Sequence, residues 1–158
     1  MLLLTIGLWF VVVLSFRVVL FGNPLYRQLV HADRDLLAGV EEVVNQEKDR
    51  ATEDEMHFLR RFSRLTLLEL AAFLLEIALL FVLYAMDVLI WLTVALLVKN
   101  ALLLIVSALV ARRRTDHRVL AGLVDLPGWL IWSDRASALL SGVGCFLLFL
   151  AVNGIKPW

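Results

Sequence analysis

The residues with the most chemical potential in this chain are four charged side chains that interrupt long apolar segments: Arg17, Glu69, Glu76 and Lys99. A charge at the centre of a bilayer costs about 2.5 to 3.5 kcal/mol on the insertion scale, so such residues pair with one another or face water. Glu76 stands eleven residues before Asp87 and Lys99 stands twelve after it. If the chain reverses near Asp87, the two lie at nearly the same depth, and we expect a salt bridge between them. Arg17 and Glu69 each lie about one turn inside the opposite boundary, which predicts a second pair.

Two roles fit Glu76 and Lys99. A charge-neutralised pair that sets the register of two helices is the simpler role, and a proton or ion pathway is the alternative. Thr93, Asn100 and Ser107 recur at intervals of seven, and this polar stripe would line an aqueous path in an oligomer. Hydrogen bonding between helices explains the same stripe without water.

Motifs of enzymatic chemistry are absent from the sequence. It contains no P-loop, no G-x-S-x-G and no H-E-x-x-H, and His31, His57 and His117 are scattered without cysteine companions. We therefore expect a non-enzymatic protein without a metal or cofactor. Fifteen Lys and Arg balance fifteen Asp and Glu, which leaves no basic surplus of the kind that marks a nucleic-acid-binding protein. Four short crossings without an internal repeat are also few for a self-contained secondary transporter.

The elements that must position these charges are long apolar helices, because 61% of the 158 residues are hydrophobic. A helix needs about 20 apolar residues to cross a bilayer, and the first segment meets that length and is expected to be a retained anchor. Residues 65–110 would be roughly 70 Å long as one straight helix, so they must fold back, with the reversal near 85–87. The prediction is an all-α, polytopic membrane protein with a four-transmembrane-helix bundle. Its expected crossings are 1–22, two helices within 65–110, and 136–153, and its expected polar parts are 23–64, 111–135 and the tail 154–158.

The first polar segment carries helix signals at both ends. Asn23 is a candidate N-cap with Pro24 at the first helical position, so a helix is expected from Pro24 to about 48–51. Thr52 and Glu55 have the spacing of a capping box, which starts a second helix that continues into the second crossing. The expected result is a cytoplasmic helical hairpin. Its helices pack on each other or on lipid headgroups, or they dock a partner.

The second polar segment opens with Arg112, Arg113 and Arg114. Such a run either contacts anionic lipid headgroups or sets the topology. Residues 119–132 predict a short interfacial helix, after which Ser133 and Asp134 are cap candidates for the fourth crossing.

Small residues gather on the fourth crossing and permit another helix to approach closely, within one chain or between subunits. They are Ser137, Ser141 and Gly144 on one face, and Ala138, Gly142 and Cys145 on the adjoining face.

The distribution of positive charge predicts the orientation. Twelve of the fifteen Lys and Arg fall in 23–64 and 111–135, against Lys156 alone on the other side. Under the positive-inside rule both segments are cytoplasmic, and both termini lie outside, in an inner or plasma membrane.

These patterns favour a non-enzymatic integral membrane subunit that self-associates or joins a larger membrane assembly, with the cytoplasmic hairpin as its contact or sensing element. Its expected partners are the lipid bilayer and a second copy or another membrane protein. The alternative is an oligomeric ion channel or pore that uses Glu76, Lys99 and Asn100.

Overall fold

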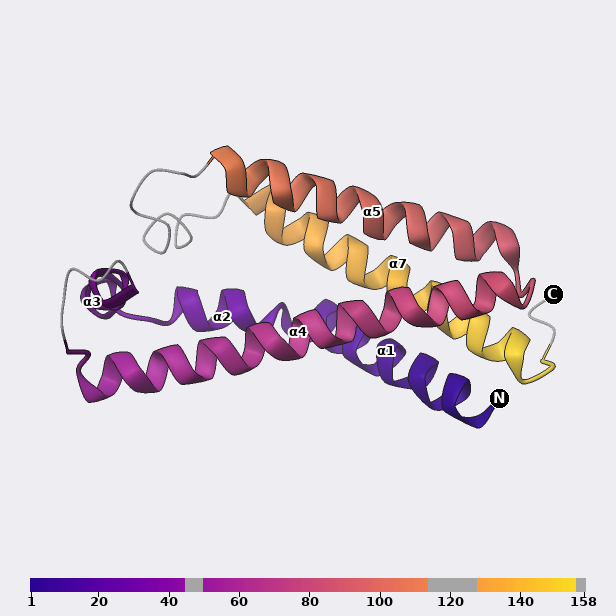
Figure 1. Ribbon diagram of the computed structural model, residues 1–158, viewed down its shortest axis with the longest axis horizontal. Helices are drawn as coiled ribbons and strands as arrows, with labels where there is room; N and C mark the ends of the chain where they lie inside the picture. Colours follow the sequence, from indigo (N-terminus) through magenta and orange to yellow (C-terminus); the bar gives the residue numbers. More distant parts are fainter. Residues whose placement is uncertain (45–49, 114–127, 156–158) are drawn as a thin grey trace.

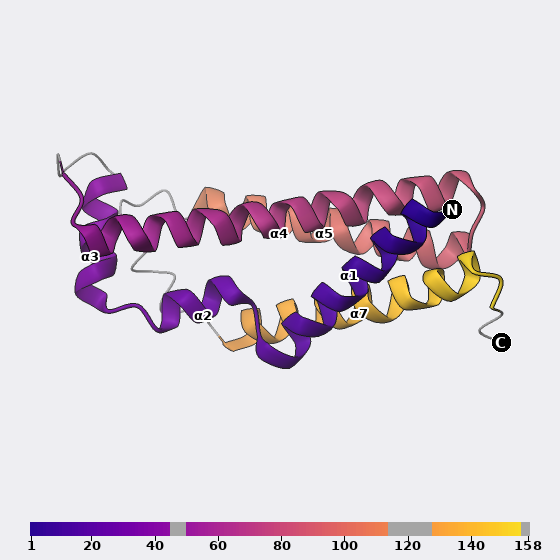
Figure 2. The same cartoon turned by 90° about the horizontal axis from the view of Figure 1, so that it is seen from below.

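The computed structural model describes residues 1–44, 50–113 and 128–155, and every regular element in these ranges is a helix. The helices are α1 (Leu2–Phe21), α2 (Pro24–Val30), α3 (Arg34–Val44), α4 (Glu53–Ala85), α5 (Ile90–Arg113) and α7 (Gly128–Val152). Figure 1 shows that α1, α4, α5 and α7 run along the long axis of an elongated molecule, with α2 and α3 at one end. The N-terminus, the α4–α5 turn and the end of α7 lie at the opposite end, and Figure 2 agrees. We refer to the two ends as the α3 end and the turn end.

The composition of the long helices is that of a membrane protein. In the described ranges, three segments are long and apolar enough to cross a bilayer: Leu2–Val30, Glu53–Ala85 and Ile131–Val152. Many large apolar side chains on these helices point outward, including Leu3, Leu67 and Leu140. An apolar exterior of this extent is unfavourable in water and is satisfied by lipid. The prediction of an all-helical protein is therefore confirmed, and three segments have the length and composition that the predicted crossings require.

A Gly-Asn-Pro sequence ends the first helix and starts the next. Gly22 adopts a left-handed φ of 77° and closes α1 with a hydrogen bond from its N–H to the carbonyl of Val18, 2.9 Å away. Asn23 then caps α2, because its Oδ1 accepts the N–H of Leu25 at 2.9 Å while Pro24 occupies the first turn. The predicted cap at Asn23 is confirmed.

The single helix predicted from Pro24 to about 48–51 is wrong, because the structure divides it into α2 and α3. The N–H of His31 still bonds to Arg27, but the next ordinary helical bond runs from Leu37 to the carbonyl of Asp33, at 3.0 Å. Asp33 therefore begins a new helix, in the position that aspartate favours. The interruption redirects the chain, so that α3 runs nearly along the line of sight in Figure 1.

This change of direction builds a small apolar core at the α3 end. Leu29 of α2, Leu37 and Val40 of α3, and Phe58 of α4 are all buried together. The side-chain amide of Gln28 also donates to the carbonyl of Phe58 at 3.3 Å. We call this arrangement, residues 23–44 packed on residues 53–62, the α2–α3 unit.

The predicted capping box starts α4 and is confirmed. The N–H of Glu55 donates to the Thr52 hydroxyl at 3.4 Å, and the N–H of Thr52 donates to the Glu55 carboxylate at 2.7 Å. From this cap α4 continues without interruption for 33 residues, which is about 50 Å at 1.5 Å per residue. It is therefore long enough to support the α2–α3 unit at one end and to cross a bilayer with the rest.

The main core lies in the half of the bundle nearest the turn end. All four long helices contribute its buried side chains: Leu8, Val11 and Val12 from α1, Leu80 and Leu83 from α4, Leu96 from α5, and Cys145 and Leu148 from α7. The α4–α5 turn closes this end at residues 86–89, beside the expected 85–87. Asp87 and Leu89 there have positive φ angles of 57° and 42°.

The predicted caps of the last crossing are wrong. Ser133 and Asp134 do not cap a helix at 136, because α7 begins at Gly128 and includes both residues in its second turn. Asp134 is half-buried and lines the same cavity as Asn23, so it faces the inside of the bundle from within α7. The interfacial helix expected at 119–132 falls largely outside the described residues, and Trp129 and Trp132 belong to α7.

Candidate functional site

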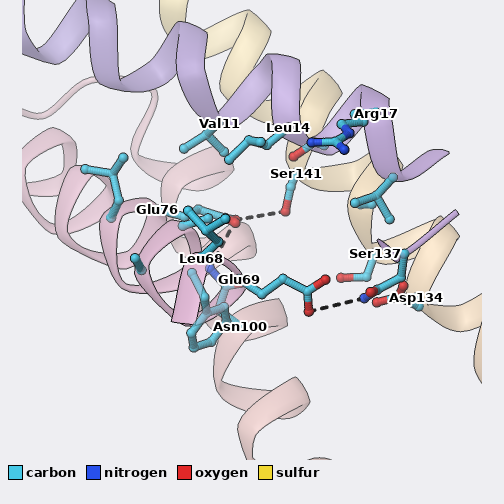
Figure 3. A pocket seen from close by; sticks show the side chains of 18 of the residues that line it. Val11, Leu14, Arg17, Leu68, Glu69, Glu76, Asn100, Asp134, Ser137 and Ser141 are labelled. Atoms are coloured by element: carbon cyan, nitrogen blue, oxygen red, sulfur yellow. Dashed lines mark hydrogen bonds between the residues drawn. The ribbon is translucent and has the colours of Figure 1, made fainter. Parts of the chain in front are cut away.

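A cavity of about 490 Å³ lies among α1, α4, α5 and α7 (Figure 3). Its walls are mostly apolar, with Phe10, Leu14, Leu68, Phe73 and Leu103 among them. Five ionisable side chains also line it: Arg17, Glu69, Glu76, Lys99 and Asp134. A volume of this size, with apolar walls and a few polar groups, is typical of small-molecule sites.

The apolar core closes the cavity at the end nearest the turn end. Its lining residues on α4 run from Leu65 to Glu76, whereas the core residues of α4 come later, at Leu80 and Leu83. On α7, in the same way, the lining ends at Ser141 and the core follows it. The cavity therefore extends from the middle of the bundle toward the α3 end, and the apolar core blocks it from the turn end.

A cluster centred on Glu76 forms the inner end of the cavity. One carboxylate oxygen, Oε1, accepts hydrogen bonds from Lys99 Nζ at 3.2 Å, from Asn100 Nδ2 at 3.1 Å and from the Ser141 hydroxyl at 2.8 Å. Lys99 also donates to Ser141. Figure 3 shows Glu76 and Ser141 turned toward each other across the cavity. The cluster connects α4, α5 and α7, and it brings together Glu76 and Lys99, which the sequence analysis pairs by depth.

Burial explains why this cluster needs several members. Glu76 is buried, and its salt-bridge partner Lys99 has only a small exposed fraction. A desolvated ion pair is stable only where further hydrogen bonds satisfy the charged groups. Asn100 and Ser141 supply those bonds, so the charges are compensated inside one chain. Ser141 is predicted from the sequence to serve helix packing only. The hydrogen bond from Ser141 to Glu76 gives it a second role.

Near the α3 end, Asn23 bonds to one carboxylate and lies beside a second. Its Oδ1 is held by the cap of α2, which leaves Nδ2 to donate to Glu69 Oε2 at 3.4 Å. Asp134 lines the same part of the cavity as Asn23 and Glu69. Figure 3 shows Glu69 and Asp134 on adjacent walls, both directed into the cavity. Two acidic side chains, one from α4 and one from α7, therefore lie beside one amide.

The predicted ion pair between Arg17 and Glu69 is not formed. Both side chains line the cavity, but among the described residues no carboxylate oxygen lies within 4.0 Å of the Arg17 guanidinium. The reason is rotational: Arg17 occupies an exposed position on α1, while the amide of Asn23 approaches Glu69 from the start of α2. Arg17 and Glu69 therefore lie at one level of the bundle, but their side chains do not point toward each other.

Two buried acceptor atoms in the cavity have no hydrogen-bond partner among the described residues: Asn100 Oδ1 and Glu69 Oε1. Asn100 is only 1% exposed. Its amide orientation follows from chemistry, because only the NH₂ group can donate to the Glu76 carboxylate. The oxygen of Asn100 is consequently left as a free acceptor in the wall of the cavity.

The predicted polar stripe on α5 does not form a continuous path in the described part of the chain. Thr93 is fully buried, does not line the cavity, and donates its hydroxyl to the carbonyl of Val88 at 2.9 Å. Asn100 lines the cavity, and the side chain of Ser107 lies outside the description. Arg112 and Arg113 lie in the last turn of α5; their side chains, and Arg114 altogether, lie outside the described residues.

The small residues of α7 divide between packing and the cavity. A Cβ added to Gly142 would lie 3.2 Å from Ser15 Cβ of α1, and one added to Gly144 would lie 2.8 Å from a methyl group of Leu96 of α5. These glycines therefore permit close packing within the chain. Ser137, Ala138 and Ser141 line the cavity instead.

Asp134 is the site residue that sequence reasoning missed. The signal was available, because Asp134, Ser137, Ala138 and Ser141 follow the spacing of one helix face. Because the helix is predicted to begin at 136, Asp134 is expected to be a cap and not a member of this face.

Comparison with protein-family models, with curated proteins and with solved structures finds no match. Within residues 1–44, 50–113 and 128–155, no group of three or more His, Cys, Asp or Glu has the arrangement of a metal site. The candidate site is thus defined by the cavity and its charges alone.

Proposed function

We propose that this chain is a non-enzymatic, four-span membrane subunit that self-associates or joins a larger membrane assembly, with the α2–α3 unit as its contact surface. The observation that carries the proposal is the α2–α3 unit itself. It has its own buried core of Leu29, Leu37, Val40 and Phe58, on an extension of α4 beyond the apolar residues. A folded unit outside the bilayer, with its own core and with exposed side chains, is suited to present a surface.

The fourth crossing of the proposal is α5. Its apolar part, Ile90–Val106, has 17 residues, which is at the short end of what spans a bilayer. However, the whole helix has 24 residues, about 36 Å, and it returns beside α4 and α7 (Figure 1). Antiparallel packing beside two spanning helices supports a span for α5 as well.

The proposed orientation places the α3 end in the cytoplasm and the turn end outside. Its support is the positive charge, since twelve of fifteen Lys and Arg lie in 23–64 and 111–135. Single cysteines introduced at Arg50 and at Gly154, in a Cys145→Ser background, test it with an impermeant thiol reagent in intact cells. We expect labelling at residue 154 and protection at residue 50. The reverse pattern would show that the orientation is inverted.

Exposed apolar side chains on the α2–α3 unit supply the expected contact. Val30 and Val44 are each 59% exposed there, in a part of the chain that lipid tails do not cover under the proposal. Val30→Asp with Val44→Asp is expected to lower the oligomer mass, or the recovery of a co-purifying membrane protein, in mild detergent and in nanodiscs. Met86→Asp, at an exposed position in the turn, is the matched control and should leave assembly unchanged.

Two results would contradict the proposal. One is a monomeric protein that retains no partner in nanodiscs. The other is an assembly that the Val30 and Val44 substitutions leave intact while the protein stays folded.

The alternative is an oligomeric ion channel in which Glu76, Lys99 and Asn100 face the conducting path. The observation in its favour is that all three line the cavity. Against it, these groups are bonded to one another within one chain, and the apolar core follows them toward the turn end. Ion flux into proteoliposomes decides: a flux that Glu76→Gln abolishes without unfolding would favour the channel over the scaffold.

A further inference from the structure

The cavity holds acceptor groups at two levels that nothing in the described chain satisfies. At the inner level, Asn100 Oδ1 lies in a side chain that is only 1% exposed and lines the cavity. At the outer level, Glu69 Oε1 is unpaired among the described residues and Asp134 lies nearby. A buried acceptor without a donor costs free energy, so a ligand that donates hydrogen bonds at these atoms would be stabilised.

We propose that this cavity binds an elongated primary alkylammonium ion, with its ammonium group at Glu69 and Asp134 and a neutral hydrogen-bond donor at Asn100. This site lies apart from the contact surface of the α2–α3 unit. It therefore does not depend on the proposed assembly.

Charge selects the class of ligand at the outer level. Glu69 and Asp134 contribute two acidic side chains, and Arg17, which also lines the cavity, contributes one basic side chain. At the inner level Glu76 and Lys99 neutralise each other. A cation is thus favoured at the outer level, while an uncharged N–H or O–H donor is favoured beside the neutral pair. An anion would meet the two carboxylates and is disfavoured.

Distance selects the shape of the ligand. Glu69 and Glu76 are seven residues apart on α4, which is about 10 Å along the helix axis. Asn100 donates to Glu76 and so lies at the inner level. A metal ion requires its ligands around one point, whereas these acceptors are separated by apolar wall. Between the levels the cavity is lined by Ala72 and Phe73, which suit a hydrocarbon chain.

A primary ammonium group with these properties has two sources. One is a soluble alkyl amine that enters from the aqueous side at the α3 end. The other, which supplies the ammonium group without a donor for Asn100, is the headgroup of phosphatidylethanolamine from the adjacent leaflet. Both carry N–H donors, whereas the quaternary ammonium of phosphatidylcholine carries none.

The experiment measures binding to the full chain in phosphatidylcholine nanodiscs by isothermal titration calorimetry, with empty nanodiscs subtracted. The probes are octylamine, octanol, octanoate and an amino-octanol with its two polar groups at opposite ends. We expect the amino-octanol to bind more tightly than octylamine, and octanol and octanoate to bind no better than to empty nanodiscs. A second arm compares melting temperatures in phosphatidylcholine discs with and without phosphatidylethanolamine. A higher melting temperature with phosphatidylethanolamine identifies the lipid as a source. An unchanged melting temperature, together with tight binding of amino-octanol in the calorimeter, identifies the soluble amine.

Variants connect the binding to the site. Glu69→Gln keeps an acceptor for Asn23 but removes one charge, and it should weaken amino-octanol binding about tenfold or more. Asp134→Asn is expected to act in the same direction. Glu42→Gln, an identical change on the exposed surface of α3, is the matched control and should bind as the unchanged protein does. Equal binding of amino-octanol and octanol would overturn the proposal without recourse to any variant. So would unchanged affinity in a folded Glu69→Gln protein.

Discussion

Replacing Glu76 and Lys99 singly and together tests the central cluster most directly. At the observed Nζ to Oε1 distance of 3.2 Å, two unit charges attract by about 5 kcal/mol at an effective dielectric constant of about 20. Desolvation offsets much of this attraction in the intact pair. Removing one partner leaves the other charge buried, and each single change, Glu76→Gln or Lys99→Met, should therefore cost about 3–5 kcal/mol of unfolding free energy.

The double change should cost no more than the worse of the two single changes, because it leaves no unpaired charge. The amide introduced by Glu76→Gln keeps an oxygen that can accept from Asn100 and Ser141, so those two hydrogen bonds survive. The assay is unfolding in a detergent mixture titrated with dodecyl sulfate, followed by tryptophan fluorescence. Glu53→Gln with Arg60→Met, both at exposed positions of α4, forms the control cycle and should shift stability by less than about 0.5 kcal/mol.

The result that would refute this reasoning is additivity. If the double variant lost the sum of the two single losses, about 6–10 kcal/mol from the figures above, the pair would have no coupling energy. Because the double change should cost no more than the worse single change, the expected coupling is at least the smaller single loss, about 3 kcal/mol, at the upper end of what groups in direct contact show.

Three further predictions concern the packing around the cavity. Asn23→Ala should lower the free energy of unfolding by about 1 kcal/mol through the lost cap of α2, and further through the lost hydrogen bond to Glu69. Unchanged stability of the variant in the same titration would contradict both contacts. Gly144→Ala should destabilise the bundle by about 1–3 kcal/mol because the new methyl group would lie 2.8 Å from a leucine of α5. Gly128→Ala meets nothing within 4 Å and serves as the comparison, so a similar loss in both would show that crowding is not the cause. Cys145 is buried, and a maleimide should label it only after unfolding; rapid labelling of the folded protein would show that α7 is not packed as described.

Local signals in the sequence were sufficient to predict the four long helices and several of the helix ends. The apolar run of the first crossing, the cap at Asn23 and the capping box of Thr52 and Glu55 all involve residues within a few positions of one another. Such interactions depend on backbone geometry that a helix imposes wherever it forms. Length alone required a reversal within 65–110, although neither glycine nor proline marks it. Equal distance from that reversal was also enough to pair Glu76 with Lys99.

Depth along a helix, however, does not determine which way a side chain faces. Arg17 and Glu69 lie at similar depth, yet Glu69 bonds to Asn23, because the chain bends at Gly22 and brings that amide inward. The break between α2 and α3 likewise follows from packing on α4, which stabilises a change of direction that helix periodicity does not encode. The cavity and the position of Asp134 in its wall depend on the rotation and tilt of four helices at once. The sequence by itself determined the four long helices and the levels of their charges. The tertiary structure decided where the chain changes direction and which groups meet, because contact requires a shared face as well as a shared depth.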